Sequence, residues 1–413
     1  MESERTRVLW ISGAPGTGKS TTGWGLFTRI AGVGGGVAHV DIDQLGLVGP
    51  PPGGGSASHR IKADNLLRML EPLRQRGVRQ VIVSGVVDPL RGIAPHLEGR
   101  AEADHVDFAL VRLRCDREEL RRRFLGRGSS AETLAELFAV ADQLDHDGPG
   151  TVLDTSGQHP EETVDALLER CVVRPAPLGA LPAEPRDGAP VPAVVVTGAT
   201  AVGKSTAAWR ALRELWTRGV PTGYVDLGQL GFVHPGPDPA LEASHLAALR
   251  RGYHRAGARA LLVVVREPAP EHSPALAGAP VTVVHLDADA PTLADRVRRR
   301  AAGEAPLLAG DELRGAPTAV QRRVAARAAA EADRMRHRAA DRTVLDTTGR
   351  TADETANALL QAARPLLDRL TPNPEESPEP PRTPPEASEG RLHPTMPDEG
   401  APHAPPEQVA VAR

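Results

Sequence analysis

The chain has 413 residues, of which 40% are hydrophobic, 25% are charged and only 3% are aromatic. This length allows two domains of ordinary size with connecting segments, and their cores must be built from aliphatic side chains. The 49 basic and 53 acidic residues give a net charge of −4. Such a near balance indicates neither a nucleic acid nor an anionic membrane as a partner.

Cysteine content and hydropathy indicate in which cellular compartment the protein resides. The two cysteines, Cys115 and Cys171, are too few for a disulfide framework or a metal cluster. The apolar run near the N-terminus is too short for a signal peptide, and no run reaches the roughly 18 residues that a membrane span needs. We therefore expect a cytoplasmic protein without a membrane span.

The first half of the chain alternates short apolar runs with helical stretches. The runs predict strands at 7–12, 37–41, 80–85, 107–113 and 151–154. Between them, Leu66, Leu70 and Leu73 lie on one face of a predicted helix that ends at Gly77. Strands that alternate with helices predict a parallel α/β sheet with right-handed crossovers.

A glycine-rich segment follows the first predicted strand. The residues GAPGTGKS, from Gly13 to Ser20, fit the pattern G-x-x-x-x-G-K-[ST]. In this pattern the glycines let successive amides point at phosphate oxygens, the lysine reaches the β and γ phosphates, and the hydroxyl binds Mg²⁺. A strand before the motif and a helix after it are the required context, so the sequence predicts an ATP site with Mg²⁺.

The second half repeats these features in the same order. The residues GATAVGKS begin at Gly198, and Lys204 follows Lys19 by 185 positions. Apolar runs recur at 193–197, 222–226, 260–265, 281–286 and 343–346. A period this long indicates the tandem duplication of a whole domain. The residues predicted to bind nucleotide are Gly13, Gly16, Gly18, Lys19, Ser20 and Thr21 in the first copy and Gly198, Gly203, Lys204, Ser205 and Thr206 in the second.

The predicted fold is α/β, with two tandem P-loop NTPase domains that each hold a five-stranded parallel sheet flanked by helices. The expected boundaries are 1–173 for the first domain, 174–191 for a proline-rich linker, 192–370 for the second domain and 371–413 for a tail. The tail is rich in Pro and Glu and poor in large apolar residues, so we expect it to be disordered. The duplication also predicts a pseudo-dimer within one chain.

Neighbouring motifs distinguish the classes of P-loop protein. The N-K-x-D motif of GTPases and the L-S-G-G-Q motif of ABC ATPases are both missing from the sequence. The end of the second predicted strand, Asp41-Ile42-Asp43, instead resembles the D-x-D of the small-molecule kinases that act on adenylylsulfate, shikimate, gluconate and nucleoside monophosphates, with chloramphenicol phosphotransferase nearby. The resemblance covers roughly 7–170 and 192–364, through short motifs only.

This resemblance implies roles for several side chains. Asp41 would join Ser20 near Mg²⁺, and Asp43 would orient or deprotonate the acceptor. The alternative is that each aspartate only caps the turn after its strand. Ser205 and Asp226 would be the corresponding metal ligands of the second copy.

Two further regions match the same kinases. Arg123 and Arg127 lie on one face of a predicted helix that would enter a mobile lid, as would Arg296 and Arg300 in the second copy, and the competing interpretation is a solvated basic face. The turns at Asp154 and Asp346 resemble the segment beside adenine. These turns also lead into a final helix, where Thr351 and Glu354 form a capping box.

The acceptor side has a weaker pattern. The resemblance suggests that Ser84, Gly85 and Asp88 line the acceptor site, and His59, Arg60 and Lys62 either lie over it, which would favour an anionic acceptor, or begin a surface helix. In the second copy Gly228 replaces Asp43, and Val264-Val265 replace Ser84-Gly85. We therefore expect phosphotransfer to a small-molecule acceptor from the first copy and nucleotide binding by the second. A regulatory ATPase or switch and a proline-tail adapter remain alternatives.

Overall fold

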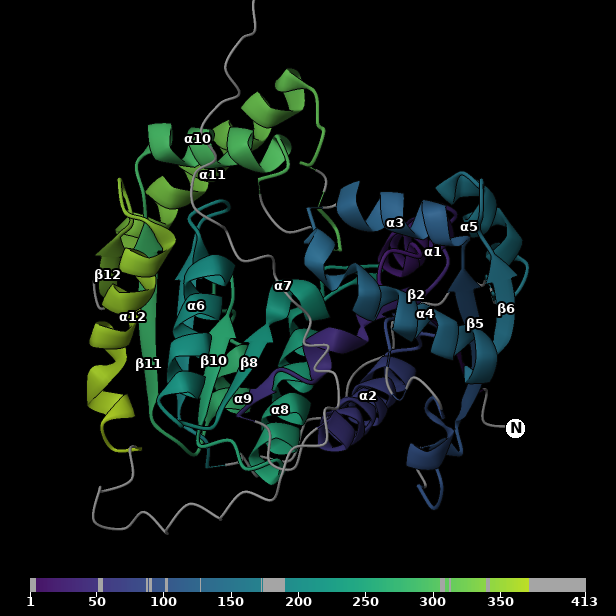
Figure 1. Cartoon of the computed structure of the whole chain (residues 1–413). Coiled ribbons are helices and arrows are strands. Elements are labelled where there is room, and N and C mark those ends of the chain that lie inside the picture. Colours follow the sequence, from purple (N-terminus) through teal and green to yellow (C-terminus); the bar gives the residue numbers. More distant parts are fainter. Residues whose placement is uncertain are drawn as a thin grey trace, which may run out of the picture.

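Figure 1 presents the computed structural model of the chain. It describes residues 5–50, 55–86, 88, 91–100, 103–126, 128–171, 173, 190–304, 309–311, 313–338 and 342–370. Most of the predicted linker (174–189) and the whole predicted tail (371–413) lie outside these ranges.

The ten apolar runs predicted as strands are strands, in two α/β arrangements. Those of the first repeat are β1 (Thr6–Gly13), β2 (Val37–Asp41), β4 (Gln80–Ser84), β5 (Val106–Arg114) and β6 (Thr151–Asp154). Those of the second repeat are β7 (Ala193–Gly198), β8 (Thr222–Asp226), β10 (Ala260–Val264), β11 (Val281–Asp287) and β12 (Thr343–Asp346). They pair in parallel in the orders β6-β5-β1-β4-β2 and β12-β11-β7-β10-β8.

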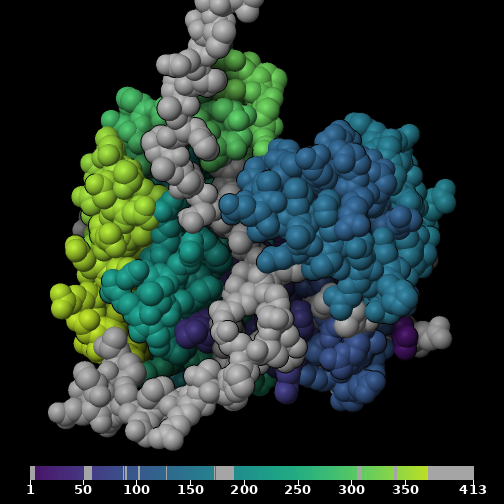
Figure 2. All heavy atoms as spheres, in the orientation of Figure 1, coloured from purple at the N-terminus to yellow at the C-terminus, as the bar shows by residue number. Residues whose placement is uncertain are grey.

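Each sheet has a sixth strand, which the sequence did not predict. Strand β3 (Val48–Gly49) of the first repeat pairs antiparallel with β8, and β9 (Val233–His234) of the second pairs antiparallel with β2. The sheets are therefore mixed and six-stranded, which corrects the expected five-stranded parallel sheets. In Figure 1 the purple ribbon of the first repeat reaches β8, and in Figure 2 a few purple atoms lie among teal ones.

The two exchanged strands are related by the repeat. Val48 lies opposite Gly223, and Val233, its counterpart in the second copy, lies opposite Ala38. Each repeat therefore covers the open edge of the other sheet with a two-residue strand. Pairing satisfies the edge amides and carbonyls that would otherwise invite association with another chain.

The helices of the first repeat are α1 (Lys19–Gly32), α2 (Gly55–Gln75), α3 (Arg117–Gly126), α4 (Leu134–Asp147) and α5 (Pro160–Leu168). Those of the second are α6 (Lys204–Thr217), α7 (Leu227–Leu230), α8 (Pro239–Arg255), α9 (His272–Leu276), α10 (Ala290–Ala301), α11 (Thr318–Arg338) and α12 (Ala352–Leu367). The predicted Leu66, Leu70 and Leu73 are buried on α2. The capping box of Thr351 and Glu354 begins α12.

The hydrophobic core is arranged in layers around α2 and α8. One cluster joins these two helices to the inward faces of both sheets, with members such as Val8 and Leu70 from the first repeat and Val195 and Leu246 from the second. Separate clusters lie on the outer faces, under α1 and α5 in one repeat and under α6 and α12 in the other. The two repeats thus share their central core.

Candidate functional site

The first glycine-rich loop joins the end of β1 to the start of α1. Gly13 has φ 138°, and a Cβ atom there would lie 2.4 Å from the carbonyl oxygen of Leu113, so this position requires glycine. Gly18 is the left-handed N-cap of α1, at φ 96°. The ammonium of Lys19 folds back onto the loop and donates to the carbonyl of Ala14 at 2.9 Å. Ser20 and Thr21 are exposed on the first turn of the helix.

The second loop has almost the same geometry. Gly198 has φ 142° and Gly203 has φ 96°, and the ammonium of Lys204 donates to the carbonyl of Ala199 at 2.9 Å. Ala201 takes the place of Gly16 and keeps its left-handed backbone, with φ 64° against 94°. A residue with a Cβ atom pays roughly 1–2 kcal/mol in this region, so the loop conformation is enforced by its surroundings. Burial lowers the pKa of Lys204 to about 8.

The Asp41-Ile42-Asp43 segment leaves the carboxyl end of β2. The Oδ1 atom of Asp41 accepts the backbone amide of Asp43 at 3.0 Å and caps a single 3-10 turn, η1 (Ile42–Leu45). The predicted cap is therefore present at Asp41. Burial raises the pKa of this carboxyl to about 7, and repulsion from Asp43 adds to the shift. Because the strands are parallel, this turn and the first loop lie at the same edge of the sheet.

Asp43 has a partner on α2. The Nζ atom of Lys62 lies 2.5 Å from its Oδ1 atom and 3.3 Å from the carbonyl oxygen of Val86. The Lys62 side chain is only 12% exposed, whereas the Asp43 side chain is 36% exposed. Lys62 thus belongs to this cluster rather than to a solvated helix surface. Burial, followed by repulsion from Lys62, lowers the pKa of the nearby His59.

Of the residues expected to line the acceptor site, Gly85 lies beside the two aspartates and Ser84 does not. Ser84 is fully buried and lies 3.3 Å, Oγ to Nε2, from His39, so its hydroxyl does not line an open site. Gly85, by contrast, has φ 113°, and a Cβ atom there would lie within 4 Å of both Asp41 and Asp43. Arg60 is exposed. Asp88 accepts the backbone amide of Arg91 at 2.9 Å.

The second repeat keeps the metal-type pair but not the second aspartate. The hydroxyl of Ser205 donates to Oδ2 of Asp226 at 2.7 Å, and the amide of Gly228 donates to Oδ1 at 3.0 Å. Gly228 therefore reproduces the backbone bond of Asp43 without its carboxylate. Burial raises the pKa of Asp226.

The predicted lid arginines bind neighbouring turns. Arg123 donates to both the hydroxyl and the carbonyl of Thr155, at 3.1 and 2.9 Å, and pairs with Glu119. Arg296 makes the same two bonds to Thr347, at 3.0 and 2.9 Å, and a third to the carbonyl of Val202 in the second loop at 2.8 Å. Arg296 thus ties the turn after the last strand to the phosphate loop in the second repeat.

The other two arginines and the two turn aspartates complete the predicted set. Arg127 lies outside the described residues, and Arg300 pairs with Asp311 at 3.0 Å. Asp154 accepts the amide and hydroxyl of Ser156, and Asp346 accepts the amide of Thr348. These bonds lower the pKa of both carboxyls, as expected for residues that cap a turn.

The donor atoms suit magnesium better than a metal with an all-protein ligand set. Among the described residues no group of three or more His, Cys, Asp and Glu side chains is placed to hold a metal. Each repeat instead offers one hydroxyl after its loop, at Ser20 or Ser205, and one carboxylate at the end of its second strand, at Asp41 or Asp226. Mg²⁺ is commonly bound in this way, through one or two carboxylates, substrate phosphates and water.

A known family model matches the part of the chain that contains the first loop. Residues 9–141 match the family model described as an AAA domain. Similarity to the P-loop superfamily is confirmed. This similarity implies nucleotide binding by the first repeat, and it does not identify a specific member. No curated protein matches the chain.

Solved structures match about two fifths of the chain. A crystal structure of APE1195 is 21% identical, with a TM-score of 0.31, and covers 40% of this chain and 95% of its own. A sugar kinase from Janibacter sp. HTCC2649 is 20% identical, with a TM-score of 0.28, and covers 41% and 96%. The tunicamycin resistance protein of Deinococcus radiodurans is 15% identical, with a TM-score of 0.33, and covers 43% and 100%.

Two contributors to these sites were missed from the sequence. Glu331, on α11, accepts the amide and hydroxyl of Thr200 in the second loop. Tyr253, on α8, donates to the carbonyl of Gln44, which follows Asp43 in the other repeat. Neither belongs to a motif, although a lone glutamate on the apolar face of a predicted helix is a pattern that sequence reading could have flagged.

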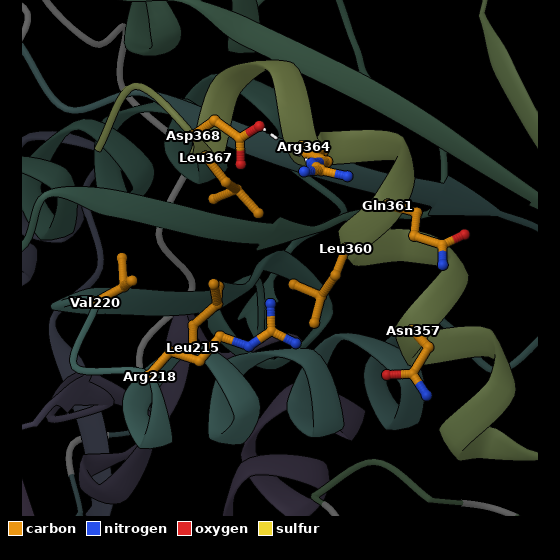
Figure 3. Close-up of a pocket in the computed structure, with 9 residues that line it drawn as sticks. All are labelled: Leu215, Arg218, Val220, Asn357, Leu360, Gln361, Arg364, Leu367 and Asp368. Atoms are coloured by element: carbon orange, nitrogen blue, oxygen red, sulfur yellow. Dashed lines mark hydrogen bonds and ion pairs between the residues drawn. The ribbon is translucent and has the colours of Figure 1, made fainter. Parts of the chain in front are cut away.

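A separate hollow of about 450 Å³ lies between α6 and α12 (Figure 3). Its lining includes Leu215 and Arg218 at the C-terminal end of α6, whereas the second loop meets the N-terminal end of that helix. It is therefore distinct from the candidate nucleotide site.

No helix in the described part of the chain is long and apolar enough to cross a membrane.

Proposed function

We propose that the chain is an ATP-dependent phosphotransferase. The first repeat transfers the γ-phosphoryl group of ATP to a hydroxyl or phosphate group of a small molecule, and the second repeat binds nucleotide. The observation that carries this proposal is the position of Asp43. Its partly exposed carboxylate lies just after the carboxyl end of β2, at the end of the sheet where the first loop leaves β1, with Lys62 beside it. Glycine takes its place in the second repeat.

The first loop would hold the phosphates. Its amides and the positive end of α1 attract anionic oxygens, and Lys19 would exchange its bond to the carbonyl of Ala14 for the β and γ phosphates. When bound, Mg²⁺ would neutralise phosphate charge from the side of Ser20 and Asp41. Arg123, and Arg127 with it, would shield the transferred group from water after lid closure.

Asp43 would act on the acceptor. A carboxylate within hydrogen-bond distance of the acceptor oxygen can orient it and accept its proton. Lys62 holds this carboxylate in place, and its own positive charge would favour an acceptor that carries an anionic group. The second repeat has Gly228 here and therefore no proton acceptor at this position.

The organisation of the chain is proposed on the same grounds. We propose two domains, 1–173 and 192–370, that form an intramolecular pseudo-dimer in the cytoplasm, each with its own nucleotide site. The adenine would lie near the turns at Asp154 and Asp346, whose aspartates also hold those turns together.

The test is ATP turnover across acceptor classes. Wild type, Lys19→Ala and Asp43→Asn would be assayed with nucleoside monophosphates, adenylylsulfate, sugar acids and hydroxylated antibiotics. We expect one class to accept phosphate, Lys19→Ala to lose ATP binding at the first loop, and Asp43→Asn to lose transfer while binding ATP. If Asp43→Asn changes neither turnover nor any transfer, the chain is a regulatory ATPase or switch instead.

A further inference from the structure

Helix α11 brings a carboxylate into the outer core of the second repeat. Its buried residues are Ala328, Glu331, Ala332 and Met335, a spacing that places all four on one face. Three of them belong to the cluster under the second sheet, and Glu331 is the charged exception, with 6% of its surface exposed. A buried carboxylate is costly unless donors satisfy it.

The donors come from the second phosphate loop. One oxygen of Glu331, Oε2, accepts the backbone amide of Thr200 at 3.0 Å and its hydroxyl at 2.9 Å. The other, Oε1, lies 3.9 Å from the guanidinium of Arg266. Attraction to Glu331 also opposes, in part, the lowering of the Lys204 pKa by burial. An anionic side chain therefore already occupies part of the loop that would receive phosphate oxygens.

The position of Thr200 decides which phosphate is affected. The loop amides and the start of α6, from Gly203, would receive the α and β phosphates, while Lys204 reaches the β and γ phosphates. Thr200 lies on the strand side of the loop, next to Ala199, whose carbonyl holds the Lys204 ammonium. A third phosphate would therefore approach the Glu331 carboxylate at Thr200, and like charges repel. The first loop has Pro15 at the equivalent position, which has no amide hydrogen to offer.

We propose that Glu331 makes the second loop selective for nucleoside diphosphates over nucleoside triphosphates. This rests on the proposed binding of nucleotide by the second repeat. The first repeat would then use ATP, while the second would respond to the diphosphate that such a reaction releases.

Calorimetry on the full chain tests this in a Lys19→Ala background, where the first loop no longer contributes. We expect ADP to bind the Lys19→Ala chain at least about tenfold more tightly than a non-hydrolysable ATP analogue. Adding Glu331→Gln should tighten the analogue and bring the two affinities within about twofold. Adding Asp333→Asn is the matched control, because it removes an exposed charge from the same helix, and it should leave the ratio unchanged.

Equal affinities in the Lys19→Ala chain, or a ratio that Glu331→Gln leaves unchanged, would overturn the proposal. If Glu331→Gln does not fold, Glu331→Asp serves instead, since the shorter side chain draws the carboxylate away from Thr200 and should also lower the ratio. If the wild-type chain binds neither nucleotide, the proposed function itself fails, whereas binding without discrimination refutes only the role of Glu331.

Discussion

The ammonium of Lys62 lies 2.5 Å from the carboxylate of Asp43, across 19 positions of sequence. This ion pair joins the middle of α2 to the turn that leaves β2. It therefore links Asp43, the carboxylate proposed to act on the acceptor, to a helix of the shared core.

Replacing Lys62 by Met should impair turnover without impairing nucleotide binding. Without its partner Asp43 is no longer held in one orientation, and a misplacement of this size can lower a rate by about a hundredfold. The measurement is ATP turnover beside the dissociation constant for ATP. Arg60→Met is the control, because Arg60 is an exposed cation two positions away and should have little effect. Equal losses in the two variants would contradict the positioning role of Lys62.

The full chain should unfold in a single cooperative transition. The two repeats exchange β3 and β9 and share the core around α2 and α8, and the ion pair of Arg76 with Asp238 also joins them. Because neither half can lose its structure without exposing the core of the other, differential scanning calorimetry should give equal calorimetric and van't Hoff enthalpies. Two separate transitions would show that the halves are independent.

Arg250 should be essential for stability. The residue is 1% exposed, and its guanidinium donates to the carbonyls of Val191, Ala275 and Ala277. Arg250→Met leaves these buried acceptors unpaired, at a cost of about 3 kcal/mol or more in the free energy of unfolding. Arg250→Lys should not restore the lost stability, because an ammonium cannot reproduce the planar set of donors of a guanidinium. Urea denaturation measures this, with the exposed Arg255→Met as the control.

His39 and His245 should each contribute less to stability as the pH falls from about 6.5 toward 4, whereas the raised pKa of Asp41 acts in the opposite direction. Burial lowers the pKa of His39 and that of His245 to about 4 each. Each imidazole is therefore neutral in the folded state and protonates in the unfolded state first. Between the unfolded and folded pKa values, each histidine removes about 1.4 kcal/mol of stability per pH unit.

Urea denaturation at several pH values checks this expectation. Acidification over this range should lower the free energy of unfolding less in His39→Gln than in the wild type, even though the variant is less stable at pH 7. The same slope in the variant and the wild type would rule out His39 as a source of the acid sensitivity.

Much of this molecule follows from local sequence patterns. The apolar runs predicted the ten parallel strands, the leucine spacing predicted α2, and the glycine-rich motifs predicted both loops, since each depends on residues that are close in sequence. The positions of Asp41 and Asp226 at strand ends follow from the same pattern, because parallel strands bring their carboxyl ends to one edge.

The tertiary structure decided what depends on distant contacts. Two-residue strands such as β3 and β9 leave no periodic pattern, and they are strands only because the other repeat offers an open edge. In the same way, Lys62 reads as a surface cation and Glu331 as a misplaced charge until packing sets each against its partner. Sequence patterns record local backbone preference and burial, whereas the pairing of charges and sheet edges depends on how the two repeats meet in space.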